Sequence, residues 1–231
     1  RAARTWCAAN GVGRSGQLFL AGYSQGGHAT MALHRELEAY HTAEFTVTGS
    51  APMAGAYDLS GVTAADLLSG RAMPNPYYFL YLLGAYQDVY HLTNRLADLL
   101  VAPYDTALPP LLDGNHSGSA INTFMPAVVT QIFRPGILEP FQTNPQHPLR
   151  LALRDNDLYR WTPKAPMRMY HCHADRDVIH ANSEVALASF HERGATHVEL
   201  HDPLPGQEAS HGDGAIPAFL AAREWFETLR Q

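Results

Sequence analysis

The chain has 231 residues, of which 46% are hydrophobic and 16% charged, so it is large and apolar enough to bury a sizeable core. Its formal net charge of -6 gives no electrostatic reason to expect a nucleic acid as a partner. No apolar run reaches the length of a membrane-spanning helix, and two cysteines do not make a disulfide framework.

Helix and strand alternate in the first part of the chain. A helix is predicted over 2–10 and a buried strand over 17–21. Apolar residues at helical spacing predict a helix over 25–40, and a β-branched run predicts a second strand over 45–50. Near-continuous apolar strands separated by a helix indicate a parallel sheet covered by helices.

The sequence Gly22-Tyr23-Ser24-Gln25-Gly26 lies between the first predicted strand and the helix that follows it. It fits the G-x-S-x-G nucleophile elbow, in which the serine adopts a strained backbone and the glycines prevent collisions between strand and helix. The motif alone is common by chance, but here it has the strand–turn–helix context that it requires. A glycine-rich turn with an incidental serine is the alternative, and Ser24 is the candidate nucleophile.

The alternation stops between residues 59 and 160. Helices are predicted over 64–68, 77–90 and 95–101, with prolines between and after them. An insertion of about a hundred residues in an α/β pattern predicts a helical cap or lid, 59–160, on a core formed by 1–58 and 161–231. The aromatic residues of the insertion either line a substrate pocket or form the packing face of the cap. They are Tyr77, Tyr78, Phe79, Tyr81, Tyr86 and Tyr90.

The α/β pattern returns near Pro166. Strands are predicted over 167–173 and 197–201, and helices over 183–193 and 216–229. The expected fold class is therefore α/β, with a mostly parallel sheet, helices on both faces and an α-helical insertion.

A serine hydroxyl is a weak nucleophile at pH 7 and needs a base to accept its proton. In this type of fold an acid and then a histidine follow the serine, each in a loop after a strand. His211 lies in the loop after the last predicted strand and is the candidate base. Asp175 follows the preceding strand and is the favoured acid, with Asp177 and Asp58 as alternatives.

The oxyanion that forms during such a reaction also needs hydrogen-bond donors. The backbone N–H of Gln25, the residue after Ser24, is the first expected donor. A second normally comes from a loop after an early strand, which this sequence does not contain. The chain begins just before what would be a middle strand, so we expect an upstream N-terminal segment that completes the fold.

The histidines near the candidate acid also suggest a metal site. His171, His173 and Asp175 share one face of the predicted strand, and His180 is close in sequence. The sequence has no second cluster at a usual ligand spacing, so ordinary packing at a strand end is preferred. We predict no metal and no other cofactor.

These features resemble the α/β-hydrolase superfamily, and more narrowly the bacterial secreted lipases and esterases with a large helical cap. The resemblance covers nearly the whole chain, although the early strands and the oxyanion loop of the family are missing. The family often has a proline after Val178 and a glycine near Cys172, which this sequence lacks. The matching segments are 22–28, 50–55, 147–150, 161–163, 172–178, 182–183 and 210–212.

The resemblance implies a serine carboxylic-ester hydrolase that acts through an acyl-enzyme. Ser24, Asp175 and His211 would be its nucleophile, acid and base, a small-molecule or lipid ester its substrate, and no cofactor would be needed. A secreted or periplasmic location rests on the resemblance alone. The alternatives are a serine peptidase of the prolyl-oligopeptidase type and a non-catalytic binding protein with a hydrolase fold.

Overall fold

A computed structural model describes all 231 residues. Its four strands form one parallel sheet in chain order. They are β1 (Phe19–Tyr23), β2 (Gly49–Met53), β3 (Met167–Tyr170) and β4 (Val198–His201). The carboxyl ends of all four strands therefore meet at one edge of the sheet, where loops from distant parts of the sequence come together.

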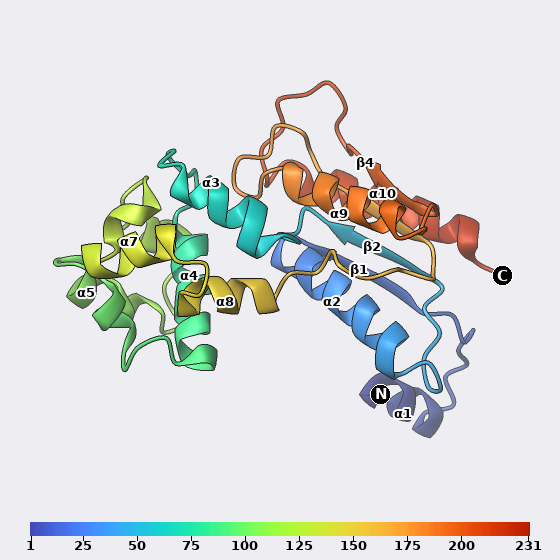
Figure 1. Cartoon of the computed structure of the whole chain (residues 1–231). Coiled ribbons are helices and arrows are strands. Elements are labelled where there is room, and N and C mark those ends of the chain that lie inside the picture. The colour runs from blue at the N-terminus through green and yellow to red at the C-terminus, as the bar shows by residue number, and fades with distance from the viewer.

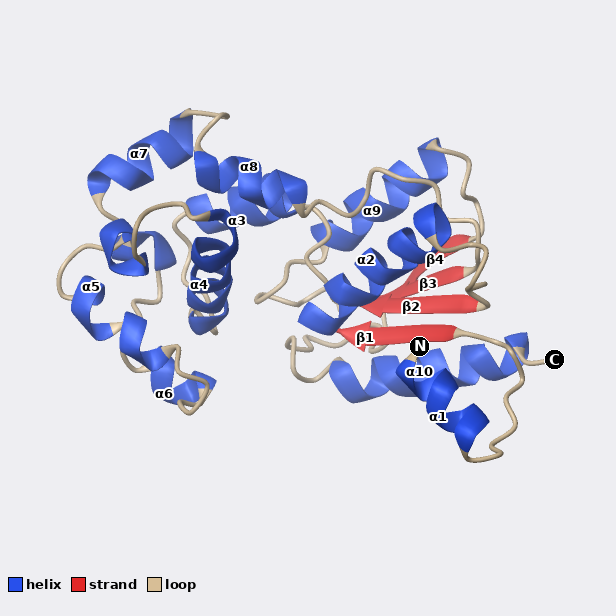
Figure 2. Ribbon diagram, turned by 90° about the horizontal axis from the view of Figure 1, so that it is seen from below, coloured by secondary structure: helices blue, strands red, loops and turns tan.

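Helices cover both faces of the sheet (Figure 2). On one face, Met169 packs with Met31 of α2 (Gln25–Tyr40) and Phe190 of α9 (Ala181–Glu192). On the other, Tyr170 packs with Ala218 of α10 (Ala215–Leu229). Neighbouring residues of β3 thus point to opposite faces, as expected for a strand buried on both sides. A short helix, α1 (Ala2–Ala9), precedes β1.

The sequence prediction placed β2 too early, at 45–50 instead of Gly49–Met53, by four residues at its start and three at its end. All five residues of β2 are buried between the helical layers, so close packing favours small residues there over the β-branched run before it. Pro52 has no N–H, and β2 and β3 pair only on either side of it, at Ser50 and at Met53. Strand β1 also lies two residues later than predicted.

Residues 59–160 form a group of helices beside the sheet, here called the helical insertion (Figures 1 and 2). The predicted helix over 95–101 is only a 3-10 turn, Leu96–Leu99, because Leu100 pairs as an isolated β-bridge with Phe133. The α-helices of the insertion are α3 (Ala64–Leu68), α4 (Tyr77–Tyr90), α5 (Tyr104–Ala107), α6 (Gly118–Asn122), α7 (Pro135–Thr143) and α8 (Pro148–Asp155). Its other turns are a π-turn at Leu59–Thr63 and 3-10 turns at Pro109–Leu111 and Val129–Ile132.

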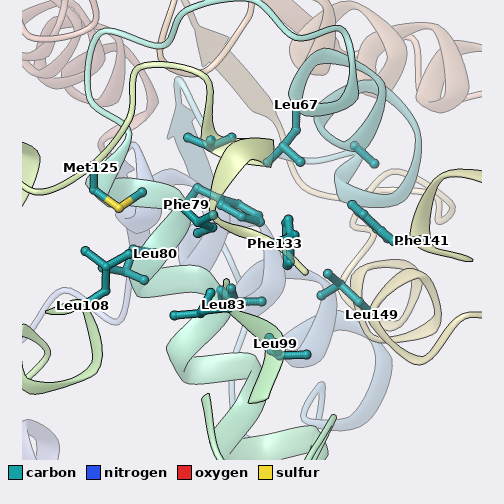
Figure 3. Packing of buried hydrophobic residues seen from close by; sticks show 14 of the residues in the cluster. Leu67, Phe79, Leu80, Leu83, Leu99, Leu108, Met125, Phe133, Phe141 and Leu149 are labelled. Atoms are coloured by element: carbon teal, nitrogen blue, oxygen red, sulfur yellow. The ribbon is translucent and has the colours of Figure 1, made fainter. Parts of the chain in front are cut away.

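The helical insertion has a hydrophobic core of its own (Figure 3). Eighteen buried apolar residues, all between Leu59 and Leu153, pack together without a residue from the sheet. Phe79 of α4 lies at its centre against Phe133, with the ring centroids 5.7 Å apart. None of the helices is both long and apolar enough to cross a lipid bilayer.

The start of α2 lies directly against the end of β2. A Cβ atom on Gly27 would overlap the carbonyl oxygen of Met53, so the helix can approach the strand this closely only with glycine at that position. The same carbonyl oxygen accepts a hydrogen bond from the backbone N–H of Ser24, at 2.9 Å. The turn between β1 and α2 is therefore fixed by its contact with β2.

We expect Gly27→Ala to lower the free energy of unfolding by about 1–3 kcal/mol, because the added methyl group forces α2 away from β2. Gly26→Ala is the matched control, since a Cβ there meets nothing within 4 Å. That variant should be as stable as the wild type or more stable by up to about 1 kcal/mol. Urea denaturation of the three proteins measures the difference, and equal losses in both variants would contradict this account.

Candidate active site

Ser24 lies at the tip of the turn between β1 and α2 with φ 58° and ψ -120°. Positive φ is costly for a residue with a side chain and persists only where the surroundings enforce it. Here the Ser24 N–H donates to Met53, and the Ser24 carbonyl accepts from the N–H of His28 at 3.0 Å. Both backbone groups of Ser24 are thus used, and its hydroxyl is left to interact with other side chains.

The structure brings Ser24, His211 and Asp175 together in one line of hydrogen bonds. His211 Nε2 lies 2.7 Å from Ser24 Oγ, and His211 Nδ1 lies 2.5 Å from Asp175 Oδ2. Because a carboxylate can only accept, the proton of the neutral imidazole is on Nδ1, which leaves Nε2 free to accept from the serine. His211 and Asp175 are both buried.

Tyr23, at the end of β1, fixes the loop that carries His211. Its hydroxyl donates to the His211 carbonyl oxygen at 2.5 Å, and the two rings lie 5.1 Å apart. Burial, together with the nearby charge of Asp175, raises the pKa of the Tyr23 hydroxyl far above its usual value. The hydroxyl therefore keeps its proton and remains a donor.

Asp175 is an ionised carboxylate in a buried site. Burial acts to raise its pKa, but hydrogen bonds from His171 and His211 outweigh burial and hold the pKa well below its usual range. Its second oxygen, Oδ1, accepts from the backbone N–H groups of Asp177 (2.9 Å) and Val178 (3.0 Å). Both carboxylate oxygens are thus satisfied, as a buried charge requires.

The two alternative acids have other partners. Asp177 accepts from the backbone and side-chain N–H groups of Asn75, at 3.0 and 2.9 Å. Asp58 accepts from the backbone N–H of Gly61 at 2.8 Å and caps the turn that begins the helical insertion. His211 has no hydrogen bond to either carboxylate.

The backbone N–H of Gln25 occupies the first position of α2, where a helix offers no acceptor of its own. The positive end of the dipole of this 16-residue helix is at the same place. An N–H at this position suits a developing negative charge next to Ser24.

Two further side chains lie beside these three residues. The sequence pattern favours strand-end packing over a metal site for His171, and in the structure its Nε2 lies 3.2 Å from Asp175 Oδ2. Tyr78 of α4 lies edge-on to His211, with ring centroids 6.1 Å apart. The contact of His171 depends on the conformation of the loop after β3, and that of Tyr78 on how the insertion packs. The aromatic-rich helix alone does not distinguish Tyr78 from its neighbours.

The histidines after β3 are occupied by hydrogen bonds. His171 Nδ1 pairs with Ser183 Oγ at 2.7 Å, and His173 Nδ1 pairs with Asp202 Oδ2 at 2.7 Å. His180 stacks on His173, with ring centroids 4.2 Å apart. No three His, Cys, Asp or Glu side chains are placed to hold a metal ion together.

Several solved structures are similar to this chain in overall fold. The rice cell wall degrading esterase LipA from Xanthomonas oryzae is 29% identical over 100% of the chain, with a TM-score of 0.86. A putative hydrolase from Legionella pneumophila is 24% identical over 100% of the chain, also with a TM-score of 0.86. Candida antarctica lipase A in its closed state is 16% identical over 98% of the chain, with a TM-score of 0.66.

The chain has the α/β-hydrolase fold with a helical cap. It spans 63%, 61% and 52% of these three structures, in the order given. No protein-family model matches the sequence, and no curated protein does. The evidence for the fold is therefore structural, and the similar chains are esterases, lipases and hydrolases.

The lowered pKa of Asp175 predicts a pH-dependent contribution to stability. An unfolded aspartate titrates near pH 4, so this contribution is complete above that pH and is lost as the pH falls below it. Asp175→Asn should therefore be less stable than the wild type near pH 7, with the difference shrinking below about pH 4. Urea denaturation over a pH series measures it, and a difference that does not change with pH would contradict the prediction.

Proposed function

We propose that the chain is a serine carboxylic-ester hydrolase that acts through an acyl-enzyme. The observation that carries the proposal is the line of hydrogen bonds from Ser24 Oγ through His211 to the buried Asp175 carboxylate. A serine on a strained turn, a histidine nitrogen beside its hydroxyl and an ionised acid behind the histidine are the parts that activate a hydroxyl for attack.

Each group has a defined role in the reaction. Ser24 Oγ attacks the ester carbonyl carbon while His211 Nε2 takes the hydroxyl proton, and the Gln25 N–H donates to the carbonyl oxygen as it becomes negative. His211 then gives this proton to the departing alcohol, which leaves an acyl group on Ser24. A water molecule, deprotonated by the same nitrogen, releases the acid. Asp175 stabilises the imidazolium in both halves.

The similar structures support ester chemistry in particular. LipA is described as an esterase and is 29–30% identical to this chain. The more distant structures support only the assignment of the fold. The side chain of the helical insertion that lies beside the His211 ring is the aromatic Tyr78. The proposed substrate is accordingly a small-molecule or lipid ester, with no cofactor.

We further propose that a segment outside these 231 residues completes the sheet beside β1. Strand β1 pairs only with β2, so its other backbone edge is unpaired. A cleft of about 410 Å³ runs between this edge and α10, lined by Phe19, Ala21, Phe219 and Phe226 among others. An added strand would use the free backbone groups and cover the aromatic rings. Its loop would supply a second oxyanion donor.

Ser24→Ala should lower kcat for ester hydrolysis by about 10⁶-fold and abolish labelling by an organophosphonate. Ser119→Ala, which changes an exposed serine of α6, is the control and should keep both properties. Both experiments use the full-length protein with matched ester and peptide substrates. Amide cleavage without preference for the ester would contradict ester hydrolysis, and labelling that persists in Ser24→Ala would contradict Ser24 as nucleophile.

Tyr78 is expected to contact the acyl part of the substrate, because it extends from the insertion to the ring of His211. Tyr78→Ala should lower kcat/KM by about tenfold for long acyl chains and less for short ones, since the lost contact is apolar. Tyr81→Ala is a matched control on the same helix, as the two tyrosines are 38% and 39% exposed. A series of esters of increasing chain length measures the effect, and equal effects of both substitutions would contradict it.

A further inference from the structure

His171 follows directly after β3 and is completely buried, with 0% of its surface exposed. Its Nε2 lies 2.8 Å from the Val178 carbonyl oxygen, and its Nδ1 lies 2.7 Å from Ser183 Oγ. A carbonyl oxygen can only accept, so the hydrogen is on Nε2, and Nδ1 accepts from the serine hydroxyl. These two bonds fix both the orientation and the tautomer of the ring.

His171 Nε2 also lies close to the candidate acid. Nε2 lies 3.2 Å from Asp175 Oδ2, the same oxygen that accepts from His211 Nδ1. The N–H donates to the Val178 carbonyl, and Asp175 Oδ2 lies beside the same nitrogen. Asp175 thus has four N–H neighbours: two imidazoles at Oδ2 and two backbone groups at Oδ1.

We propose that His171 is a positioning residue that holds Asp175 Oδ2 in line with His211. We propose also that it weakens the electrostatic attraction between this oxygen and His211. This inference rests on the proposed function of Ser24 and His211. The terminal torsion of an aspartate is soft, so a carboxylate held only by His211 could turn about it. The second imidazole donor at Oδ2 opposes that rotation.

The same hydrogen bond has an electrostatic effect. A donor that shares Oδ2 stabilises the ionised carboxylate and thereby weakens the attraction between that oxygen and the charged form of His211. Without this donor, Asp175 should hold an extra proton on His211 more strongly. Activity would then fall at a higher pH on the acid side of the profile, and the serine would be deprotonated less often in the correct geometry.

Other titratable groups lie near Asp175 and His211 on the neighbouring elements. Burial raises the pKa of the Tyr23 hydroxyl and of the Cys172 thiol, the latter to about 11, so both are neutral at pH 7. Burial, with His171 and His173 close by, lowers the pKa of His180, which therefore gains charge only on acidification. The full set of neighbouring titratable groups is Tyr23, Cys172, His180, Asp213, Asp177 and Tyr78. Every variant below retains all of them.

His34 provides a matched control, because it is also 0% exposed and likewise has a serine hydroxyl at Nδ1 and a carboxylate oxygen near Nε2. Its Nδ1 lies 2.7 Å from Ser50 Oγ, and its Nε2 lies 3.0 Å from Glu38 Oε1. His34 lies ten residues along α2 from Ser24, a distance of about 15 Å. Its loss should therefore destabilise the protein in a similar way without affecting Asp175.

The test compares His171→Asn, His171→Gln and His34→Asn in the full-length protein. Asparagine reaches only as far as the Nδ1 position and loses the donor to Asp175, whereas glutamine reaches the Nε2 position and keeps one. We expect His171→Asn to lower kcat by about 10- to 100-fold with KM unchanged, and to move the acid-side midpoint of activity to higher pH. His171→Gln should recover most of the loss, and His34→Asn should retain the wild-type kcat and midpoint.

Proton NMR separates this inference from the proposed function, because it needs no substrate. The low-field resonance of the proton between His211 and Asp175 should shift in His171→Asn and stay in place in His34→Asn. A folded His171→Asn with wild-type kcat, midpoint and resonance would overturn the inference. A wild-type protein that cleaves no ester would overturn the proposed function and leave the NMR test valid.

Ser183→Ala provides the test if His171→Asn does not fold. It removes the partner of Nδ1 but leaves the imidazole in place, so the ring loses its orientation while the carboxylate keeps a nearby donor. We expect a shift of the resonance and a fall in kcat in the same direction, both smaller than for His171→Asn. Wild-type values for both would overturn the proposed role of His171.

Discussion

The carbonyl oxygen of Met53, at the end of β2, satisfies two requirements at once. It accepts a hydrogen bond from the N–H of Ser24 at 2.9 Å, and it leaves no room for a side chain on Gly27. The turn after β1 is therefore held from its neighbouring strand, which enforces the positive φ of Ser24. The position of the hydroxyl follows from this packing, and α2 could not start where it does with a larger residue at Gly27.

The second constraint is the burial of an ionised carboxylate. Taking the charge of Asp175 out of water costs free energy that only well-placed donors offset. Four N–H groups surround it, from the His211 loop, from His171 and from the backbone of its own loop. The parallel sheet makes this set available, since the loops after β3 and β4 both leave its carboxyl edge.

The sequence alone located the elements that are specified by residues close to one another in the chain. Helices α2 and α4 have the predicted bounds, and chain order predicted that Ser24, Asp175 and His211 would meet, as their hydrogen bonds show. It misplaced β2, because burial on both faces overrides β propensity there. It could not choose among three aspartates with certainty or find the contact of His171, since both depend on loop conformation.

The loop from Asp175 to Val178 connects the candidate active site to the helical insertion. Its first residue, Asp175, accepts a hydrogen bond from His211. Two residues later, Asp177 accepts two hydrogen bonds from Asn75, which lies just before α4. Between them, the Arg176 carbonyl accepts from Arg71 at 2.7 Å. The backbone N–H of Asp177 in turn donates to Asp175. The insertion and the acid thus share one short segment, so a displacement of the insertion would act on the carboxylate that orients His211.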